Sequence, residues 1–153
     1  MLEPCTPQAM LDTLSRQAEL LGELIQVGRD QRAAIDSGRI NELLAVLATK
    51  QTQLEELGAI RERLSDWKSA VEAPYFWPDQ GMRELARQLR DRCEGAFGTL
   101  IEMEKDCEHA LTTSREQIQI RLKQLDSGRS AADAYAAHSS QAVSPRVDFS
   151  SMG

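Results

Sequence analysis

Apolar residues recur along the chain at steps of three and four, the spacing that aligns side chains on one face of a helix. Thr6 and Pro7 form an N-cap followed by a proline at the first helical position, and Gly38 can adopt the left-handed conformation that ends a helix. The pattern therefore predicts a helix over about 7–35. Its apolar stripe comprises Leu11, Leu14, Ala18, Leu21, Ile25, Gly28 and Ile35.

A second stripe begins at Ile40 and predicts a coiled-coil helix over about 40–72. Residues 73–79 follow, with two prolines and three of the chain's seven aromatic residues, and they read as a connector. We expect this connector to bury its aromatic side chains at one end of a bundle instead of forming an exposed docking loop. The second stripe comprises Leu43, Leu47, Lys50, Leu54, Leu57, Arg61, Leu64, Lys68 and Val71.

A third stripe predicts a long helix over about 79–126, which ends at the tetrapeptide Asp-Ser-Gly-Arg of residues 126–129. The low aromatic content of 5% and the charged content of 27% favour helices over sheets. The predicted fold is all-α: an elongated antiparallel three-helix coiled-coil bundle with a long third helix. We expect one helical domain over 1–136 and a disordered, serine-rich tail over 137–153.

The three predicted helices differ in length, at roughly 44, 51 and 70 Å for a rise of 1.5 Å per residue. In an up-down-up bundle, about 19 Å of the third helix, from Ser114 to Asp126, would extend beyond the other two. Large apolar side chains in such a segment predict a partner-binding site. The predicted site residues are Leu111, Ile118, Leu122 and Leu125, joined by Tyr135 on the evidence of the resemblance given below.

Two alternatives to this site remain open. Residues 113–116 read as a possible T-x-x-E capping box, which would break the helix and fold its end back onto the bundle. The apolar stripe could also be a contact in a homodimer, as in a structural coiled-coil protein that oligomerises without a client.

The net charge, the apolar runs and the cysteines limit the classes of partner and the cellular location that we expect for this protein. With 18 basic and 24 acidic residues, the net charge is −6, which disfavours nucleic acid and anionic membrane surfaces. We find neither a signal-peptide pattern at the N-terminus nor an apolar run long enough for membrane insertion, so we expect a cytoplasmic protein. Cys93 and Cys107 lie two heptads apart and are predicted to share a buried helix face in a reducing compartment.

Catalytic chemistry is not indicated. Asp106 and His109 have the spacing of carboxylate-bridged metal sites in helical bundles, with Glu102 one turn earlier, but a second carboxylate-x-x-His pair is missing from the sequence. Phosphate-binding loops and nucleophile elbows are also missing. We therefore predict no catalytic residue, no metal, no cofactor and no enzymatic activity.

Five glycines fall inside the predicted helices, and each costs about 1 kcal/mol relative to alanine. Close helix packing, particularly around residues 95–98, would explain them, and so would a bundle soft enough to rearrange around a client. The five are Gly22, Gly28, Gly58, Gly95 and Gly98.

The order of these features carries a resemblance. Residues 33–64 read AAIDSGRINELLAVLATKQTQLEELGAIRERL, a turn around glycine and then a leucine-rich helix with Lys50 and Arg61, and the last helix leads to an Ala-Tyr segment with Tyr135. In this order the chain resembles the FlgN family of flagellar type III export chaperones. The resemblance implies a chaperone that binds hook-associated proteins of the hook-filament junction before type III secretion. It places the client on Ile118, Leu122 and Leu125, and an export gate component at Tyr135; the sister chaperone type that serves the filament cap stays an alternative.

Overall fold

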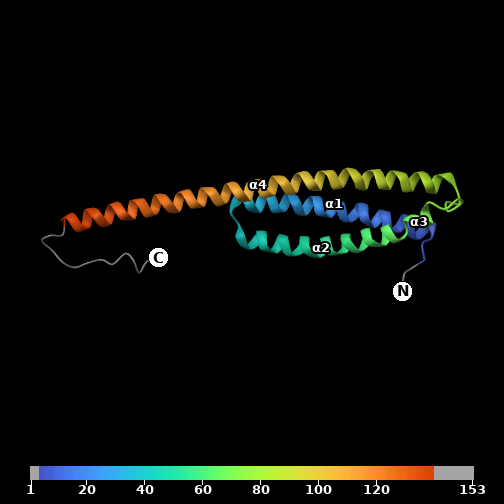
Figure 1. Ribbon diagram of the computed structural model, residues 1–153, viewed down its shortest axis with the longest axis horizontal. Helices are drawn as coiled ribbons and strands as arrows, with labels where there is room; N and C mark the ends of the chain where they lie inside the picture. The colour runs from blue at the N-terminus through green and yellow to red at the C-terminus, as the bar shows by residue number, and fades with distance from the viewer. Residues whose placement is uncertain (1–3, 140–153) are drawn as a thin grey trace. The chain divides into compact units, whose positions relative to one another are not determined.

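The computed structural model describes residues 4–139, and all regular secondary structure in that range is helical (Figure 1). The helices are α1 (Pro7–Ser37), α2 (Ile40–Asp66), α3 (Lys68–Val71) and α4 (Gln80–Ser139). The predicted all-α class is confirmed, with four helices where three were expected. The chain divides into two compact units, Met1–Thr112 and Thr113–Gly153, called the first and the second unit.

Both ends of α1 follow from the predicted capping residues. The Thr6 hydroxyl accepts a hydrogen bond from the Ala9 amide at 3.1 Å, and Pro7 is the first helical residue. Gly38 adopts the left-handed conformation with φ 67° and ψ 22°, and the next amide, that of Arg39, donates to the Ala34 carbonyl at 3.0 Å. These bonds satisfy the last carbonyls of α1 and reverse the chain into α2.

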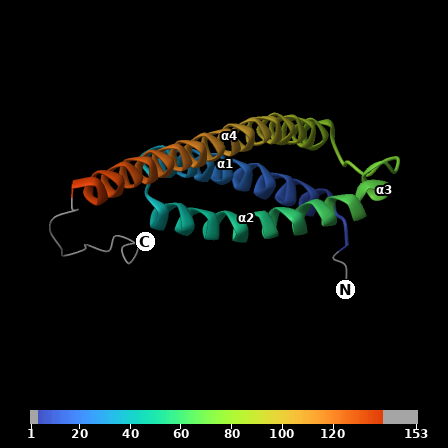
Figure 2. The same cartoon turned by 60° about the vertical axis from the view of Figure 1, so that its left-hand side comes forward.

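The core of the first unit lies between α1, α2 and residues 80–112 of α4 (Figures 1 and 2). Leucines of α1 form its centre, because α1 lies alongside both other helices and buries several of its turns completely. One cluster joins Leu20, Leu21 and Leu24 of α1 to Leu57 and Ile60 of α2 and Cys93 of α4. A second cluster, beside α3, joins Met10, Leu11 and Leu14 to Trp67 and Ala86.

Two cysteines set the register between α1 and α4. The Cys93 thiol contacts the Leu14 carbonyl and the Cys107 thiol contacts the Gly28 carbonyl, each at a sulfur-to-oxygen distance of 3.9 Å. Both pairs are 79 residues apart, so the two helices run parallel and keep one alignment over two heptads. Burial raises the pKa of both thiols, which keeps them protonated and unreactive. The predicted shared, buried face is confirmed.

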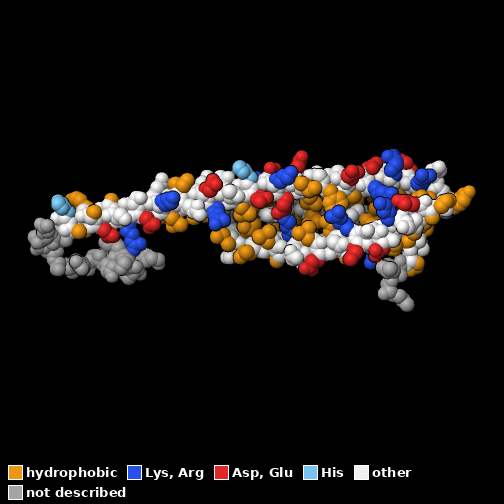
Figure 3. Space-filling view, viewed as in Figure 1, with side chains coloured by type: hydrophobic (Ala, Val, Ile, Leu, Met, Phe, Trp, Pro, Cys, Tyr) orange, Lys and Arg blue, Asp and Glu red, His pale blue; other side chains and the backbone are white. Residues whose placement is uncertain are grey.

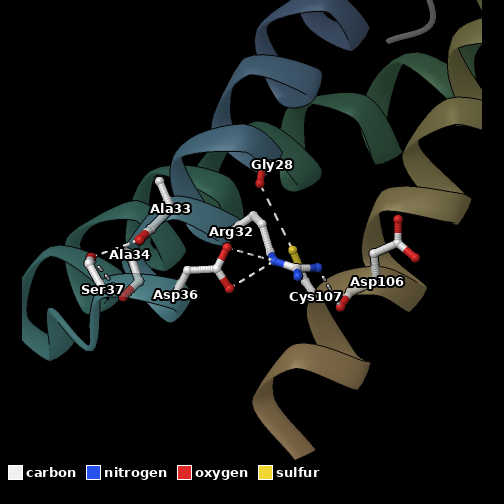
Figure 4. Close-up of polar contacts among 8 residues, drawn as sticks. All are labelled: Gly28, Arg32, Ala33, Ala34, Asp36, Ser37, Asp106 and Cys107. Carbon is white, nitrogen blue, oxygen red and sulfur yellow. Dashed lines mark hydrogen bonds and ion pairs between the residues drawn. The ribbon is translucent and has the colours of Figure 1, made fainter. Parts of the chain in front are cut away.

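Near the end of α1, Arg32 adds a polar contact to the same helix pair (Figure 4). Its Nε lies 3.0 Å from both carboxylate oxygens of Asp36, and its Nη1 donates to the Asp106 carbonyl at 3.3 Å. Asp36 belongs to the same helix and Asp106 to α4. The guanidinium therefore connects the last turns of α1 to α4 next to the Gly28 and Cys107 contact.

Lys50 joins all three long helices of the first unit. From α2, its ammonium donates to the side-chain amide oxygen of buried Gln31 in α1 at 3.1 Å, and it forms a short ion pair with Glu104 of α4. One heptad and a half further along α2, the Arg61 guanidinium lies over the Phe97 ring of α4, 5.1 Å from its centroid. These contacts run in opposite order along α2 and α4, which makes the two helices antiparallel.

Replacing Lys50 with methionine is expected to lower the free energy of unfolding by about 1–2 kcal/mol, since the buried amide oxygen of Gln31 loses its lysine donor. Methionine keeps most of the aliphatic stem, so the loss reports mainly the polar contact. Glu104→Ala should cost about 0.5 kcal/mol or less, because its carboxylate is more than half exposed. Urea denaturation of both variants measures the difference, and a larger loss in Glu104→Ala would contradict this assignment.

The prediction of a second helix over 40–72 was wrong at its C-terminal end. α2 stops at Asp66, and Trp67 separates it from the four-residue α3. The break falls at a core residue, because the Trp67 side chain is buried in the cluster of Met10, Leu11 and Leu14.

The aromatic connector divides into a partly buried and an exposed part. Phe76 and Trp77 pack against the cluster beside α3, with their rings edge to face at a centroid distance of 4.9 Å. For these two residues, the contacts agree with the expected packing of the connector's aromatic side chains at one end of the bundle. Tyr75 differs: it is 99% exposed and has a left-handed backbone with φ 66°. Its side chain takes no part in closing this end of the bundle.

The predicted end of the third helix was also wrong. α4 runs through residues 126–129 without interruption and ends at Ser139. It also passes through residues 113–116, so the alternative of a break at a capping box is excluded. Residues 137–139 of the predicted tail are helical, and residues 140–153 lie outside the described residues.

Candidate partner-binding surface

The second unit, as far as it is described, consists of residues 113–139 of α4. Ile118, Leu122 and Leu125 are spaced by four and three residues, so they lie on one face of this helix. Their exposed fractions are 57%, 55% and 64%. We call these three residues the C-terminal stripe. Large apolar side chains aligned this way and left in solvent make this face a candidate surface for a partner protein.

The other two predicted site residues are not among the three residues of this stripe. Leu111 belongs to the first unit, where its side chain is partly exposed. Tyr135 is exposed and follows Leu125 by ten residues, which turns it about 80° around the helix from that leucine. The structure thus brings Ile118, Leu122 and Leu125 onto one face and places Tyr135 on another.

Ile120 provides an internal comparison for the C-terminal stripe. Its exposed fraction is 57%, equal to that of Ile118, and two residues along a helix turn it about 160° away from Ile118. The two isoleucines therefore have the same side chain and the same exposure on opposite faces of one helix.

A second apolar surface was missed by the sequence analysis. Ile40, Leu44, Leu47 and Leu54 share one face of α2 and remain exposed, whereas the pattern placed Leu47 and Leu54 in the core. Hydrophobic side chains gather over the first unit between α2 and α4 in Figure 3. The stripe of α2 that enters the core is instead centred on Leu57 and Ile60.

Within residues 4–139, no group of three or more His, Cys, Asp or Glu side chains is arranged to hold a metal ion. None of the helices in that range combines the length and the apolar character needed to cross a bilayer.

Comparison with known protein families shows to which family this chain belongs. The family model described as "FlgN protein" matches residues 1–140, which is most of the 153-residue sequence. The chain belongs to the FlgN family. We found no match to it among curated proteins or among solved structures.

FlgN proteins are chaperones of flagellum assembly, so membership supports a chaperone function and gives no indication of catalysis. The match extends over both units and includes the C-terminal stripe and Tyr135. In this FlgN protein, Lys50 and Arg61, two residues of the sequence resemblance, both reach from α2 to α4. Their described contacts hold the bundle together.

Proposed function

We propose that this FlgN protein binds hook-associated proteins of the hook-filament junction in the cytoplasm and holds them before type III secretion. The C-terminal stripe is the observation that supports this proposal: three aligned apolar side chains, each more than half exposed, on a helix of a chaperone-family protein. Amphipathic helices of a client would pack against the stripe as the missing partner of a coiled coil. Tyr135, on a different face, would remain accessible to an export gate component while the client is held.

The small area of the C-terminal stripe limits the free energy of binding that it can contribute. Complete burial of one such side chain is worth about 1.5–3 kcal/mol, so burying the exposed part of all three gives about 3–5 kcal/mol. A free energy of about 4 kcal/mol corresponds to a dissociation constant near 1 mM. A chaperone complex stable enough to purify therefore needs further contacts beside the stripe.

Co-expression with the hook-associated proteins of the same organism tests the proposal. The variant Ile118→Gln, Leu122→Gln, Leu125→Gln is expected to co-purify less than about a tenth of the client held by the wild-type chain, since at least 3 kcal/mol of apolar burial is lost. Far-ultraviolet circular dichroism should show unchanged helix content. The amount of client on the affinity resin is the measurement.

Two controls accompany this experiment. Ile120→Gln matches Ile118→Gln in chemistry and exposure but changes the opposite face, so it should retain the client. Tyr135→Ala should also retain it. Equal capture by the stripe variant and the wild type would contradict the proposed site. Failure of the wild type to capture any client, together with self-association that the stripe variant loses, would favour the alternative, a structural coiled-coil protein without a client.

A further inference from the structure

The charges around the C-terminal stripe are predominantly basic. With about 100° per residue, Arg115 and Arg121 lie roughly 60° to either side of Ile118, so they border the stripe on both flanks. Arg129 follows Leu125 by four residues, in line with the stripe, and is half-buried in a stretch of otherwise exposed residues. The stripe is thus flanked and followed by arginines.

Acidic residues of the same helix are placed differently. Glu116 lies roughly 160° from Ile118, on the far face of the helix. Asp126 and Asp133 lie about 80° and 60° from that direction, both on one side and both towards the C-terminal end of the stripe. Along residues 115–125, the charged side chains that border the stripe are arginines only.

This arrangement runs against the charge of the rest of the chain. Residues 1–112 contain 13 basic and 20 acidic residues, a net charge of −7, whereas residues 113–153 contain five basic and four acidic residues, a net charge of +1. A partner drawn only by overall charge would be basic. A partner selected by the stripe and its borders would be acidic.

We infer that the C-terminal stripe selects an amphipathic helix whose own apolar stripe is bordered by aspartate and glutamate. The inference rests on the proposed function and defines the chemistry of the client segment. Charges beside an apolar seam set partner choice and register in coiled coils. Arginine suits this role because its planar guanidinium pairs with a carboxylate through two hydrogen bonds. These pairs supply the further contacts that the three apolar side chains need.

Two synthetic peptides of 28 residues test this selection on the full chain. Both have leucine at positions a and d of each heptad; one has glutamate at positions e and g, and the other has lysine there. Like charges keep each peptide from pairing with itself. In 50 mM salt, the glutamate peptide is expected to bind at least tenfold more tightly by fluorescence anisotropy. In 1 M salt, where charges more than about 3 Å apart are screened, the ratio should fall below about threefold.

Substitutions connect this preference to the three arginines. The variant Arg115→Gln, Arg121→Gln, Arg129→Gln should bind the two peptides within about threefold of each other in 50 mM salt. Lys123→Gln is the control, because Lys123 lies about 140° from Ile118 and should leave the preference intact. Leu122→Gln should weaken binding of both peptides.

Equal binding of the two peptides, tighter binding of the lysine peptide or binding of neither would overturn the inference. Binding of the chain to vesicles of anionic lipid that is lost in the arginine variant would also overturn it, because the arginines would then serve a membrane surface. The proposed function is tested separately. Clients captured equally by the wild type and the arginine variant, but lost from the stripe variant, would leave that function standing and remove only the acidic selection.

Discussion

Leu21→Ala is expected to lower the free energy of unfolding by about 3–5 kcal/mol. Leu21 is completely buried in α1 and packs in the cluster shared with α2 and α4, so alanine leaves a cavity where three helices meet. A loss of this size is a large share of the stability of an ordinary domain. Chemical denaturation followed by circular dichroism measures it.

The matched control for this prediction is Ile120→Ala. Ile120 is 57% exposed, so its truncation should change the free energy of unfolding by no more than about 0.5 kcal/mol. A cost below about 1 kcal/mol for Leu21→Ala would show that α1 is not the centre of the core.

Replacing four helical glycines with alanine is expected to have the opposite effect. Each substitution should stabilise its helix by about 0.5–1 kcal/mol, so the combined variant should gain about 2–4 kcal/mol and melt at a higher temperature. A side chain added at these positions meets nothing within 4 Å in the structure. The four are Gly22, Gly58, Gly95 and Gly98.

Gly28 is the control for this series. A Cβ there would lie 2.7 Å from the Met103 methyl group, so Gly28→Ala has to displace that side chain and should gain less than the average of the other four. Of the two explanations for the five glycines, close packing applies to Gly28 only. The close packing expected around residues 95–98 was wrong, because a Cβ at Gly95 or Gly98 meets nothing within 4 Å. A combined variant that is no more stable than the wild type would show that the other positions are constrained as well.

The capping residues of α1 were predictable from the sequence. Whether a repeated tetrapeptide ends a helix at each of its two positions was not. The tetrapeptide Asp-Ser-Gly-Arg occurs at 36–39 and at 126–129. The first copy ends α1 with Gly38 left-handed, and the second copy lies inside α4. After the first, α2 packs back against α1; after the second, an alanine-rich segment with high helix propensity follows. The segment that follows, through packing after the first copy and helix propensity after the second, decides whether the helix stops.

Periodicity also left the faces of α2 ambiguous. One three-and-four stripe contains Leu47, Leu54, Leu57 and Leu64, so the spacing alone does not show which of these leucines the core covers. Packing against α1 buries Leu57 and Ile60 and leaves Leu47 and Leu54 exposed. The sequence cannot separate the covered leucines from the exposed ones, since the outcome depends on the rotation of α2 relative to its neighbours.

The lengths of the predicted helices indicated where the candidate site lies. That comparison singled out Ser114 to Asp126, and the chain divides into its two units between Thr112 and Thr113. The alignment of Ile118, Leu122 and Leu125 on one face follows from their spacing alone. The position of Tyr135 on another face required the helix to continue past Gly128, which the sequence had argued against. The client itself lies in another chain, so its identity is beyond any pattern in this one.

The constant offset of 79 residues between α1 and α4 has a consequence for how such a chain can change over evolution. A one-residue insertion between Leu14 and Gly28 would rotate everything beyond it by about 100° and move the Gly28 carbonyl away from the Cys107 thiol. Only a matching insertion between Cys93 and Cys107 would restore the alignment. Changes in length are therefore tolerated in the connector of residues 72–79 or in the second unit, and the paired segments of α1 and α4 must lengthen or shorten together.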